Sequence, residues 1–239
     1  MDLSAVLRLL YRGPRGDAPG VVNPYREAVP ELDGPAAARR RRENLETYLE
    51  RVGVPRVVLL GEALGFRGGR YSGIAFTSER QLAGPEERRL PWAGPPFRAT
   101  SRNPILWLEP SGSVVWGALG GQARGALVWN TFPWHPHGAK GPLSNRTPER
   151  SLVAANLHVL ERLLAEIDGA RVLAVGRTAQ AALATLGVKA LALRHPSHGG
   201  AHLFRQQLWQ AEGHGRQGMA PARRDKATCR RPPGARHQD

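Results

Sequence analysis

The sequence is poor in cysteine, with Cys229 the only one among 239 residues. A single cysteine excludes a disulfide framework, and it also excludes an iron–sulfur cluster or a zinc site built only from cysteines. A chain of this length buries enough apolar surface to fold as one domain without cross-links. Scarce cysteine is typical of proteins from a reducing compartment, and we expect a cytoplasmic location.

Long apolar runs are also absent. No stretch of the sequence approaches the roughly 18 apolar residues that cross a bilayer. The apolar stretch within residues 1–17 is short and interrupted by arginine, which is not the pattern of a signal peptide. We therefore expect no membrane partner.

Lysine is rare, whereas arginine is abundant. The chain has three lysines and 31 arginines, and its net charge is +14. Because the guanidinium group presents a planar fork of donors that suits phosphate, this composition favours a polyanionic partner, most simply a nucleic acid. A genome rich in G and C, which favours arginine codons, would give the same composition, and that alternative stays open.

The charge is concentrated towards the end of the chain. Residues 216–239 hold seven basic and two acidic residues, include three prolines and lack apolar periodicity. Such a segment cannot bury enough apolar surface to fold. We expect one domain over residues 1–215, followed by a basic disordered tail over residues 216–239.

Within the domain, four short apolar runs alternate with stretches of helical periodicity. The runs that predict strands are residues 57–60, 126–130, 171–175 and 189–196. The predicted helices are residues 35–52, 146–167 and 178–187. In the second helix, Thr147 is the predicted N-cap and Pro148 lies in the first turn. This alternation predicts an α/β fold with three αβα layers around a central, mostly parallel four-stranded sheet.

Polar clusters follow three of the predicted strands. Glu62 follows the first strand, Asn130 ends the second, and His195 follows the fourth. Because ligands of parallel sheets bind beyond the carboxyl ends of the strands, we expect these side chains to meet at one edge. The sequence has neither a GxxxxGK[ST] phosphate loop nor a GxGxxG fingerprint, so we expect no cofactor.

These segments resemble the motifs of the uracil-DNA glycosylase superfamily. GEALGFRGGRYSGIAFTSE, residues 61–79, resembles the first motif. LVWN, which ends at Asn130, resembles the strand that carries a base-reading asparagine, and RHPSHGG, residues 194–200, resembles the second motif. Residues 144–149 resemble the Asn-Arg-x-Pro segment of the iron–sulfur branch. The resemblance implies a monomeric DNA-repair glycosylase that hydrolyses the N-glycosidic bond of uracil, or of another deaminated base, in DNA.

Three departures separate this chain from the branches it resembles. The iron–sulfur branch needs four cysteines, so this chain is expected to be a cluster-free relative. Leu64 replaces the proline of the GEAPG motif, and Ala63 stands where some branches have a catalytic acid or amide. These replacements leave open a glycosylase-like nucleic-acid-binding module with little or no hydrolysis. A small-molecule nucleoside hydrolase is disfavoured by the net charge.

The resemblance implies specific roles for five residues. Glu62 would orient water and stabilise a cationic sugar, and His195 would donate to uracil O2 as charge develops there. Phe76 would stack on the base, and the amide of Asn130 would match its O4 and N3–H. Gly65 stands where the most selective branch places a tyrosine against uracil C5, so we expect a permissive pocket. Each side chain also has a purely structural alternative, in a loop, a turn or the core.

The resemblance and the charge also suggest a DNA-contacting surface. The residues expected to contact DNA are Arg67, Arg70, Ser197, His198 and Gly199. Basic side chains and accessible glycine backbone suit phosphate. Gly199 matches a leucine that wedges into the duplex in the most selective branch, so extrusion of a paired base is expected to be harder here.

Two histidines raise the question of a metal. His135 and His137 are two residues apart in the segment WHPH. No cysteine lies nearby, and the spacing is not that of two ligands on one helical face. We expect no metal at this segment.

Overall fold

The computed structural model describes residues 2–16, 18–167 and 169–212, and the predicted tail over residues 216–239 lies outside them. The helices are α1 (Ser4–Arg12), α2 (Ala37–Val52), α3 (Gly69–Ser72), α4 (Glu79–Ala83), α5 (Pro110–Leu119), α6 (Arg150–Ala165), α7 (Arg177–Thr185) and α8 (Ala201–Ala211). The strands are β1 (Val21–Val22), β2 (Val57–Ala63), β3 (Ala126–Phe132), β4 (His135–Pro136), β5 (Arg171–Val175) and β6 (Leu191–Leu193). Short 3₁₀ helices cover Glu86–Arg88, Gly120–Gly125 and Gly141–Leu143.

The central sheet has four parallel strands in the order β3-β2-β5-β6. Val58 of β2 pairs with Leu127 of β3 on one side and with Val172 of β5 on the other. All four strands therefore end at the same edge of the sheet. The predicted fold class is confirmed, and an additional antiparallel pair of β1 with β4 lies outside this sheet.

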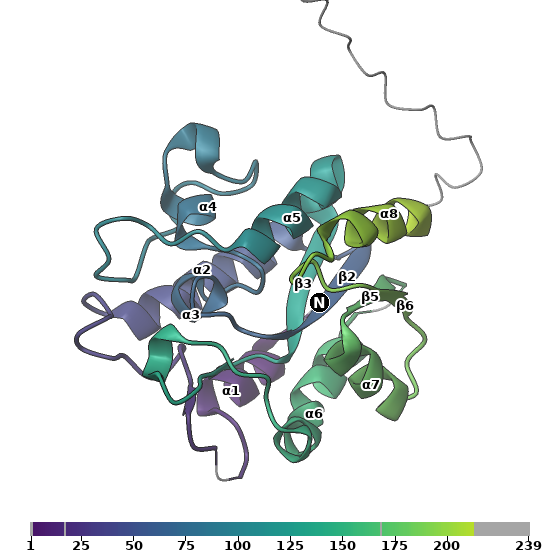
Figure 1. Cartoon of the computed structure of the whole chain (residues 1–239), viewed down its shortest axis with the longest axis horizontal. Coiled ribbons are helices and arrows are strands. Elements are labelled where there is room, and N and C mark those ends of the chain that lie inside the picture. The colour runs from purple at the N-terminus through teal and green to yellow at the C-terminus, as the bar shows by residue number, and fades with distance from the viewer. Residues whose placement is uncertain (1, 17, 168, 213–239) are drawn as a thin grey trace, which may run out of the picture.

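Helices cover both faces of the sheet (Figure 1). Helices α6 and α7 pack on one face, and α1 packs on α6. On the other face α5 lies beside α8, and α2 runs along β3. Tyr48 of α2 also protects the free edge of β3, because its hydroxyl donates to the carbonyl of Ala126 and accepts from the N–H of Val128, both at 2.8 Å.

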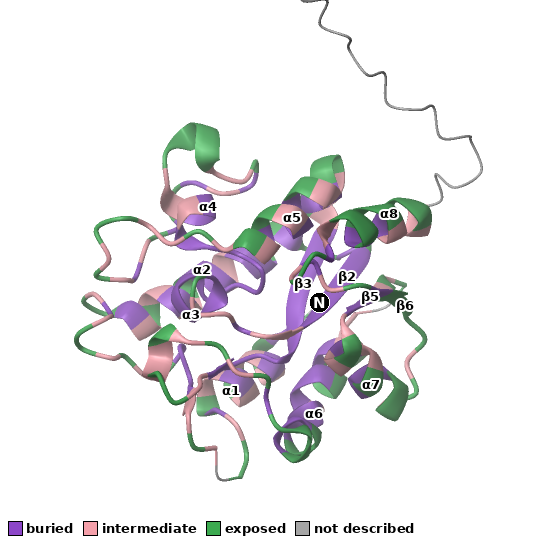
Figure 2. Cartoon of the chain, in the orientation of Figure 1, coloured by how far each residue is buried: buried purple, intermediate pink, exposed green. Residues whose placement is uncertain are grey.

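Burial follows this layering (Figure 2). All seven residues of β3 are buried, as are the first five of β2. The covering helices are buried along one stripe and exposed along the other, as an amphipathic helix must be. Within the described residues, no helix combines the length and the apolar character needed to cross a membrane.

The strands that carry the expected site residues differ in length from the prediction. Strand β2 continues through Ala63, so Glu62 lies inside this strand rather than after it. Strand β3 continues through Phe132, so Asn130 lies inside it rather than at its last position. The last strand is confined to Leu191–Leu193. Ladder pairing with β3 holds Gly61 and Ala63 extended although this segment is not a continuous apolar run.

Helix α6 also begins later than predicted. Its N-cap position is Glu149, and Thr147 makes no capping hydrogen bond to it. The side chain of Glu149 instead forms an ion pair with Arg146 at 2.9 Å. The backbone at Glu149 is extended, so the helix begins only after this residue. Helices α1, α5 and α8 were not among the predicted helices, and α5 contacts the site at Phe76.

Candidate active site

Phe76 and Asn130 meet above Gly61 at the end of β2. A Cβ atom on Gly61 would lie 2.6 Å from Phe76 Cε2 and 2.6 Å from Asn130 Oδ1. Such distances are too short for a Cβ atom, so any other residue at this position would displace the ring or the amide. Gly61 also pairs directly with Asn130 in the parallel ladder. The register of the sheet therefore places the carboxamide of Asn130 beside Gly61, where the ring of Phe76 also lies.

The amide of Asn130 has no hydrogen-bond partner among the residues that the structure describes. Its side chain is almost completely buried, and neither Oδ1 nor Nδ2 forms a hydrogen bond within the described part of the chain. Leaving a buried polar group unpaired costs about 1–3 kcal/mol. An amide held in this way presents one acceptor and two donors to a ligand.

Phe76 is held in an unusual backbone conformation. Its φ angle is +51°, in the left-handed region that is strained for a phenylalanine. Gly112 of α5 packs directly against its main chain, since a Cβ atom there would overlap the carbonyl oxygen of Phe76. The ring of Phe76 lies 6.1 Å from the ring of His195, measured between centroids.

His195 is fixed in one tautomer by Ser197. The Ser197 N–H donates to His195 Nδ1 at 3.2 Å, and the Ser197 hydroxyl lies 2.7 Å from the same nitrogen. Nδ1 therefore accepts, and the proton of the neutral ring is on Nε2. Burial lowers the pKa of His195, the charge of Glu62 opposes this, and Arg194 and His198 add to it. The neutral ring is a hydrogen-bond donor at Nε2.

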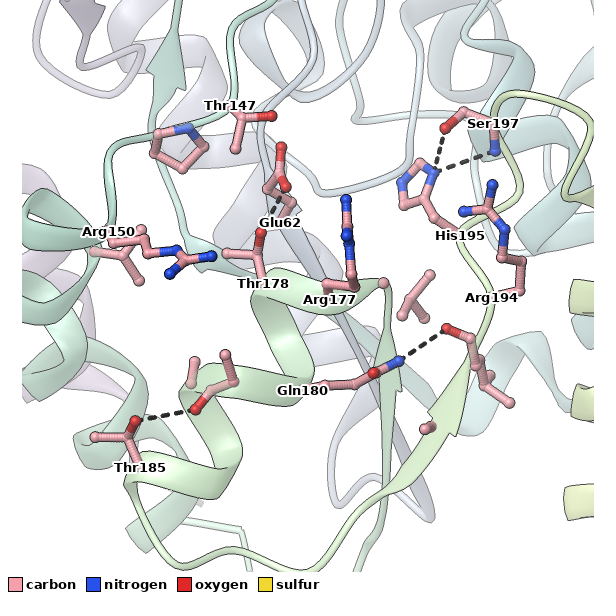
Figure 3. Close-up of a pocket in the computed structure, with 18 of the residues that line it drawn as sticks. Glu62, Thr147, Arg150, Arg177, Thr178, Gln180, Thr185, Arg194, His195 and Ser197 are labelled. Carbon is pink, nitrogen blue, oxygen red and sulfur yellow. Dashed lines mark hydrogen bonds between the residues drawn. The ribbon is translucent and has the colours of Figure 1, made fainter.

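Glu62 lies on the other face of the sheet from Asn130. Adjacent strand residues point to opposite faces, so Gly61 faces Phe76 while Glu62 faces α7. The Thr178 hydroxyl donates to Glu62 Oε2 at 2.6 Å (Figure 3). Glu62 and His195 line the same cavity of 1160 Å³. Glu62 thus lies on the His195 side of the site rather than on the Asn130 side.

Three arginines line the same cavity as Glu62 and His195. They are Arg150 from α6, Arg177 from the start of α7 and Arg194 from the end of β6 (Figure 3). All three are exposed. Sequence reasoning missed them, although Arg177 and Arg194 follow strand ends as the expected site residues do. The cavity suits an anionic ligand.

The loop after β2 is anchored without the proline of the GEAPG motif. The N–H of Leu64 donates to the carbonyl of Trp134 at 3.0 Å, and His135 Nδ1 lies 2.8 Å from the carbonyl of Leu64. The N–H of Phe66 donates to Asn145 Oδ1 at 2.9 Å. Burial lowers the pKa of His135 to about 4. His135 and Asn145 are therefore parts of the support for this loop.

The space beside Gly65 is occupied by an unexpected residue. A Cβ atom on Gly65 would lie 2.9 Å from Glu109 Oε1. The neighbouring rings of Phe66 and Tyr71 pack on Trp107, with ring centroids 5.7 Å and 5.9 Å from it. No sequence signal singled out Glu109, which is separated from Gly65 by more than forty residues.

Arg70 is not on the surface. It is fully buried, and its two terminal nitrogens each donate to a carboxylate oxygen of Asp33 at 2.9 Å. The buried Arg41 binds the same carboxylate. Although burial opposes it, the hydrogen bonds from Arg70 and the charges of both arginines lower the pKa of Asp33. This corrects the expectation that Arg70 contacts DNA, and it identifies Arg70 as part of the core.

The other residues expected to contact DNA are accessible or lie close to the site. Arg67 is exposed and stacks on the ring of Phe66 at 5.2 Å. Ser197 is partly buried and binds His195. His198 and Gly199 are exposed and have positive φ angles of +50° and +74°. This loop borders the cavity next to His195.

His135 and His137 face each other with ring centroids 6.2 Å apart. His135 Nε2 lies 3.0 Å from the carbonyl of Pro142, so both of its ring nitrogens lie against main-chain oxygens. Among the described residues, no group of three histidine, cysteine, aspartate or glutamate side chains is arranged to hold a metal ion.

Comparisons with known proteins give one family and one fold. The model of the uracil DNA glycosylase superfamily matches residues 51–211, which is more than half of the chain. The crystal structure of wild-type SMUG2 from Pedobacter heparinus is similar, with a TM-score of 0.60 and 15% sequence identity over 90% of this chain and 98% of that one. A search of curated proteins gave no match. At this identity, the likeness to SMUG2 concerns the fold.

Proposed function

This chain belongs to the uracil-DNA glycosylase superfamily, and on that premise we propose that it removes uracil from DNA by hydrolysing the N-glycosidic bond. The observation that carries the proposal is the buried amide of Asn130, whose oxygen and nitrogen form no hydrogen bond within residues 2–16, 18–167 and 169–212. The Watson–Crick edge of uracil presents a carbonyl oxygen beside an N–H. Such an edge satisfies both amide groups at once.

The remaining side chains fit the steps that the reaction requires. The base must leave the duplex before its sugar bond can be reached, and Phe76 offers a ring face to stack on it. Negative charge develops on the leaving base, where the Nε2–H of His195 would donate a hydrogen bond. The carboxylate of Glu62 would stabilise the positive charge that develops on the sugar.

Charge supports DNA as the partner. Arg150, Arg177 and Arg194 line the cavity that contains Glu62 and His195, and Arg67 is exposed on the neighbouring loop. Guanidinium groups on one side of the site would bind the phosphates that flank the extruded nucleotide. This arrangement predicts that affinity falls as salt rises.

The test is a labelled oligonucleotide that contains one uracil. It is incubated with the protein and then treated with alkali, which cleaves the strand at an abasic site. Cleavage at the uracil position supports the proposal, and an identical oligonucleotide with cytosine is the control. Retarded mobility without cleavage would favour the alternative, a glycosylase-like module that binds nucleic acid without hydrolysis.

A further inference from the structure

Glu109 is a carboxylic acid that none of the steps above uses. It immediately precedes Pro110, the first residue of α5, and its side chain turns back onto the loop after β2. A Cβ atom on Gly65 would lie 2.9 Å from Oε1, and one on Gly68 would overlap Oε2. Glycine at both positions leaves the room that the carboxyl group occupies.

The described residues leave one oxygen of the Glu109 carboxyl group without a hydrogen bond. Oε2 is buried and has no hydrogen-bond partner within the described residues. Burial raises the pKa of Glu109 to about 7. A carboxyl group that titrates near neutral pH is suited to accept and release protons in a reaction. A buried carboxyl oxygen without a hydrogen bond lowers the stability of the fold. Stability alone therefore does not account for the position of Glu109.

Glu109 lies on the same side of the sheet as Phe76 and Asn130. Gly112, three residues further along α5, contacts the main chain of Phe76, and its Cβ position is 3.2 Å from Glu109 Oε2. Glu62 points to the opposite face, where Thr178 holds it. Ala63 has no functional group. On the side of Asn130, Glu109 therefore places a carboxyl group against Gly65 and Gly68 of the loop after β2.

A cavity opens in front of this carboxyl group. It has a volume of 500 Å³ and lies between the loop that contains Gly65 and the loop that contains Ser197 and His198. Ser197 is the residue that fixes His195. Arg67 and His198 are the other charged or titratable residues that line the cavity. Glu109 and the loop that follows His195 therefore line one cavity. The cavity is large enough for water and for part of a nucleotide.

We propose that Glu109 is a catalytic residue that binds the attacking water molecule and accepts its proton. This inference rests on the proposed glycosylase function and names the base of that reaction. It assigns different tasks to the two carboxylates. Glu62 stabilises charge from the α7 side, and Glu109 activates water from the α5 side.

The reaction balances with these groups alone. The water oxygen forms a bond to C1′ of the deoxyribose, and the C1′–N1 bond breaks with its electron pair passing to the base. One water proton goes to the Glu109 carboxylate. The base leaves as an anion that accepts a hydrogen bond from His195 Nε2–H. Glu109 then releases its proton to solvent or to the departing base, and the products are free uracil and an abasic deoxyribose.

The first measurement is the single-turnover rate of uracil excision as a function of pH. For the wild type, we expect the rate to rise as pH increases through about 7, because the carboxylate form is the base. Glu109→Gln keeps the shape of the side chain and cannot accept the proton. We expect it to be at least 100-fold slower at pH 8, without the rise near pH 7 and with DNA affinity within about threefold of wild type.

Rescue distinguishes a chemical role from a structural one. Added formate is expected to restore part of the rate of Glu109→Ala, because the small acid can enter the space vacated by the side chain. Glu62→Ala in the same buffer is the matched control and is expected to show no rescue. Ser111→Ala, which changes the same cavity without removing a carboxylate, is expected to retain the wild-type pH profile.

The outcomes separate this inference from the proposed function. Uracil excision by Glu109→Gln at the wild-type rate and with the wild-type pH profile would overturn the role of Glu109 and leave the glycosylase function intact. Loss of activity in Glu109→Ala without any formate rescue, together with an unchanged pH profile in Glu109→Gln, would also overturn it. A wild-type protein that excises no uracil would overturn both.

Discussion

Gly112 of α5 and Phe76 fit together at the main chain, because a Cβ atom on Gly112 would overlap the carbonyl oxygen of Phe76. Phe76 has a positive φ angle at this point, so the contact lies where the backbone is already strained. A helix that carries no expected site residue therefore packs directly against the main chain of Phe76.

We expect Gly112→Ala to reduce uracil excision at least tenfold, because the added methyl group displaces Phe76 from its position above Gly61. Single-turnover kinetics on a uracil-containing single strand would measure this loss. Gly117 is the matched control, since it lies on the same helix with nothing within 4 Å of its Cβ position. Gly117→Ala should retain activity and stabilise the protein by about 0.5–1 kcal/mol. Equal activity of the two variants would contradict the structural role of Gly112.

Asn130→Asp is expected to abolish uracil excision or to redirect it towards cytosine. An aspartate offers only acceptors, so it faces the uracil carbonyl with a repulsive contact. We expect a loss of at least 100-fold for uracil, measured as release of base from otherwise identical oligonucleotides with uracil or cytosine. Asn103→Asp, whose side chain serves a surface loop, is the control. Uracil activity that persists in Asn130→Asp would remove Asn130 from the site.

Glu62→Ala should lower the rate of the chemical step by about 100-fold while leaving DNA affinity nearly unchanged. Electrostatic stabilisation acts in the transition state and contributes little to ground-state binding. Thr178→Val, which removes the 2.6 Å hydrogen bond to the carboxylate but keeps its charge, should have a smaller effect. Single-turnover rates and equilibrium binding would be compared for both. A Glu62→Ala rate within a few-fold of wild type would exclude this role.

The pKa of His195 should respond in opposite directions to two substitutions. In the wild type, burial holds this pKa below 6.5, the charge of Glu62 raises it, and Arg194 lowers it. Glu62→Gln should therefore lower the pKa further, and Arg194→Ala should raise it. NMR titration of the imidazole resonances measures both shifts, with the other histidines as internal controls. Shifts of the same sign in the two variants would contradict the geometry described for this site.

Activity should rank single-stranded uracil and the U·G mismatch above the U·A pair. Gly199 has no side chain to insert into the duplex, and nothing lies within 4 Å of its Cβ position. Unstacking and unpairing cost a few kcal/mol, least for bases that are already unpaired. Rates on one sequence in the three forms, at the same low salt, would test the ranking.

Equal rates on all three forms would show that another residue acts as the wedge. His198, exposed and with a φ angle of +50°, is the candidate. If His198→Gly then restored the ranking, that residue would be identified.

The sequence predicted the sheet because each strand contains a short apolar run between polar segments. It did not predict the ends of β2 and β3, since Gly61, Glu62 and Thr131 are not strongly apolar and are held extended by ladder pairing. Helix α5 was missed because Pro110, Gly112 and Gly117 weaken its helical pattern. Tertiary packing against α8 compensates for this low propensity.

Candidate site residues could be predicted where a polar side chain lies near the end of an apolar strand. They could not be predicted where the side chain comes from a segment that is distant in the sequence. His195 follows β6 and Asn130 lies near the end of β3, so the strand pattern was enough to indicate both residues. Glu109 was not indicated in this way, because only folding brings it onto Gly65. Arg70 was misassigned for a related reason. Its partner Asp33 is distant in the sequence, and the charge pattern of a loop does not reveal that an arginine is buried with its counter-ion.

The position of β2 within the sheet has a consequence for synthesis of the protein. Val57 pairs with Ala126 and with Arg171, so its partners are made about 70 and 115 residues later. At the roughly 5–20 residues per second of translation, several seconds separate the emergence of β2 from that of β5. During this interval a strand with four consecutive buried apolar residues has an unpaired edge, which makes the nascent chain, rather than the folded protein, the form most exposed to aggregation.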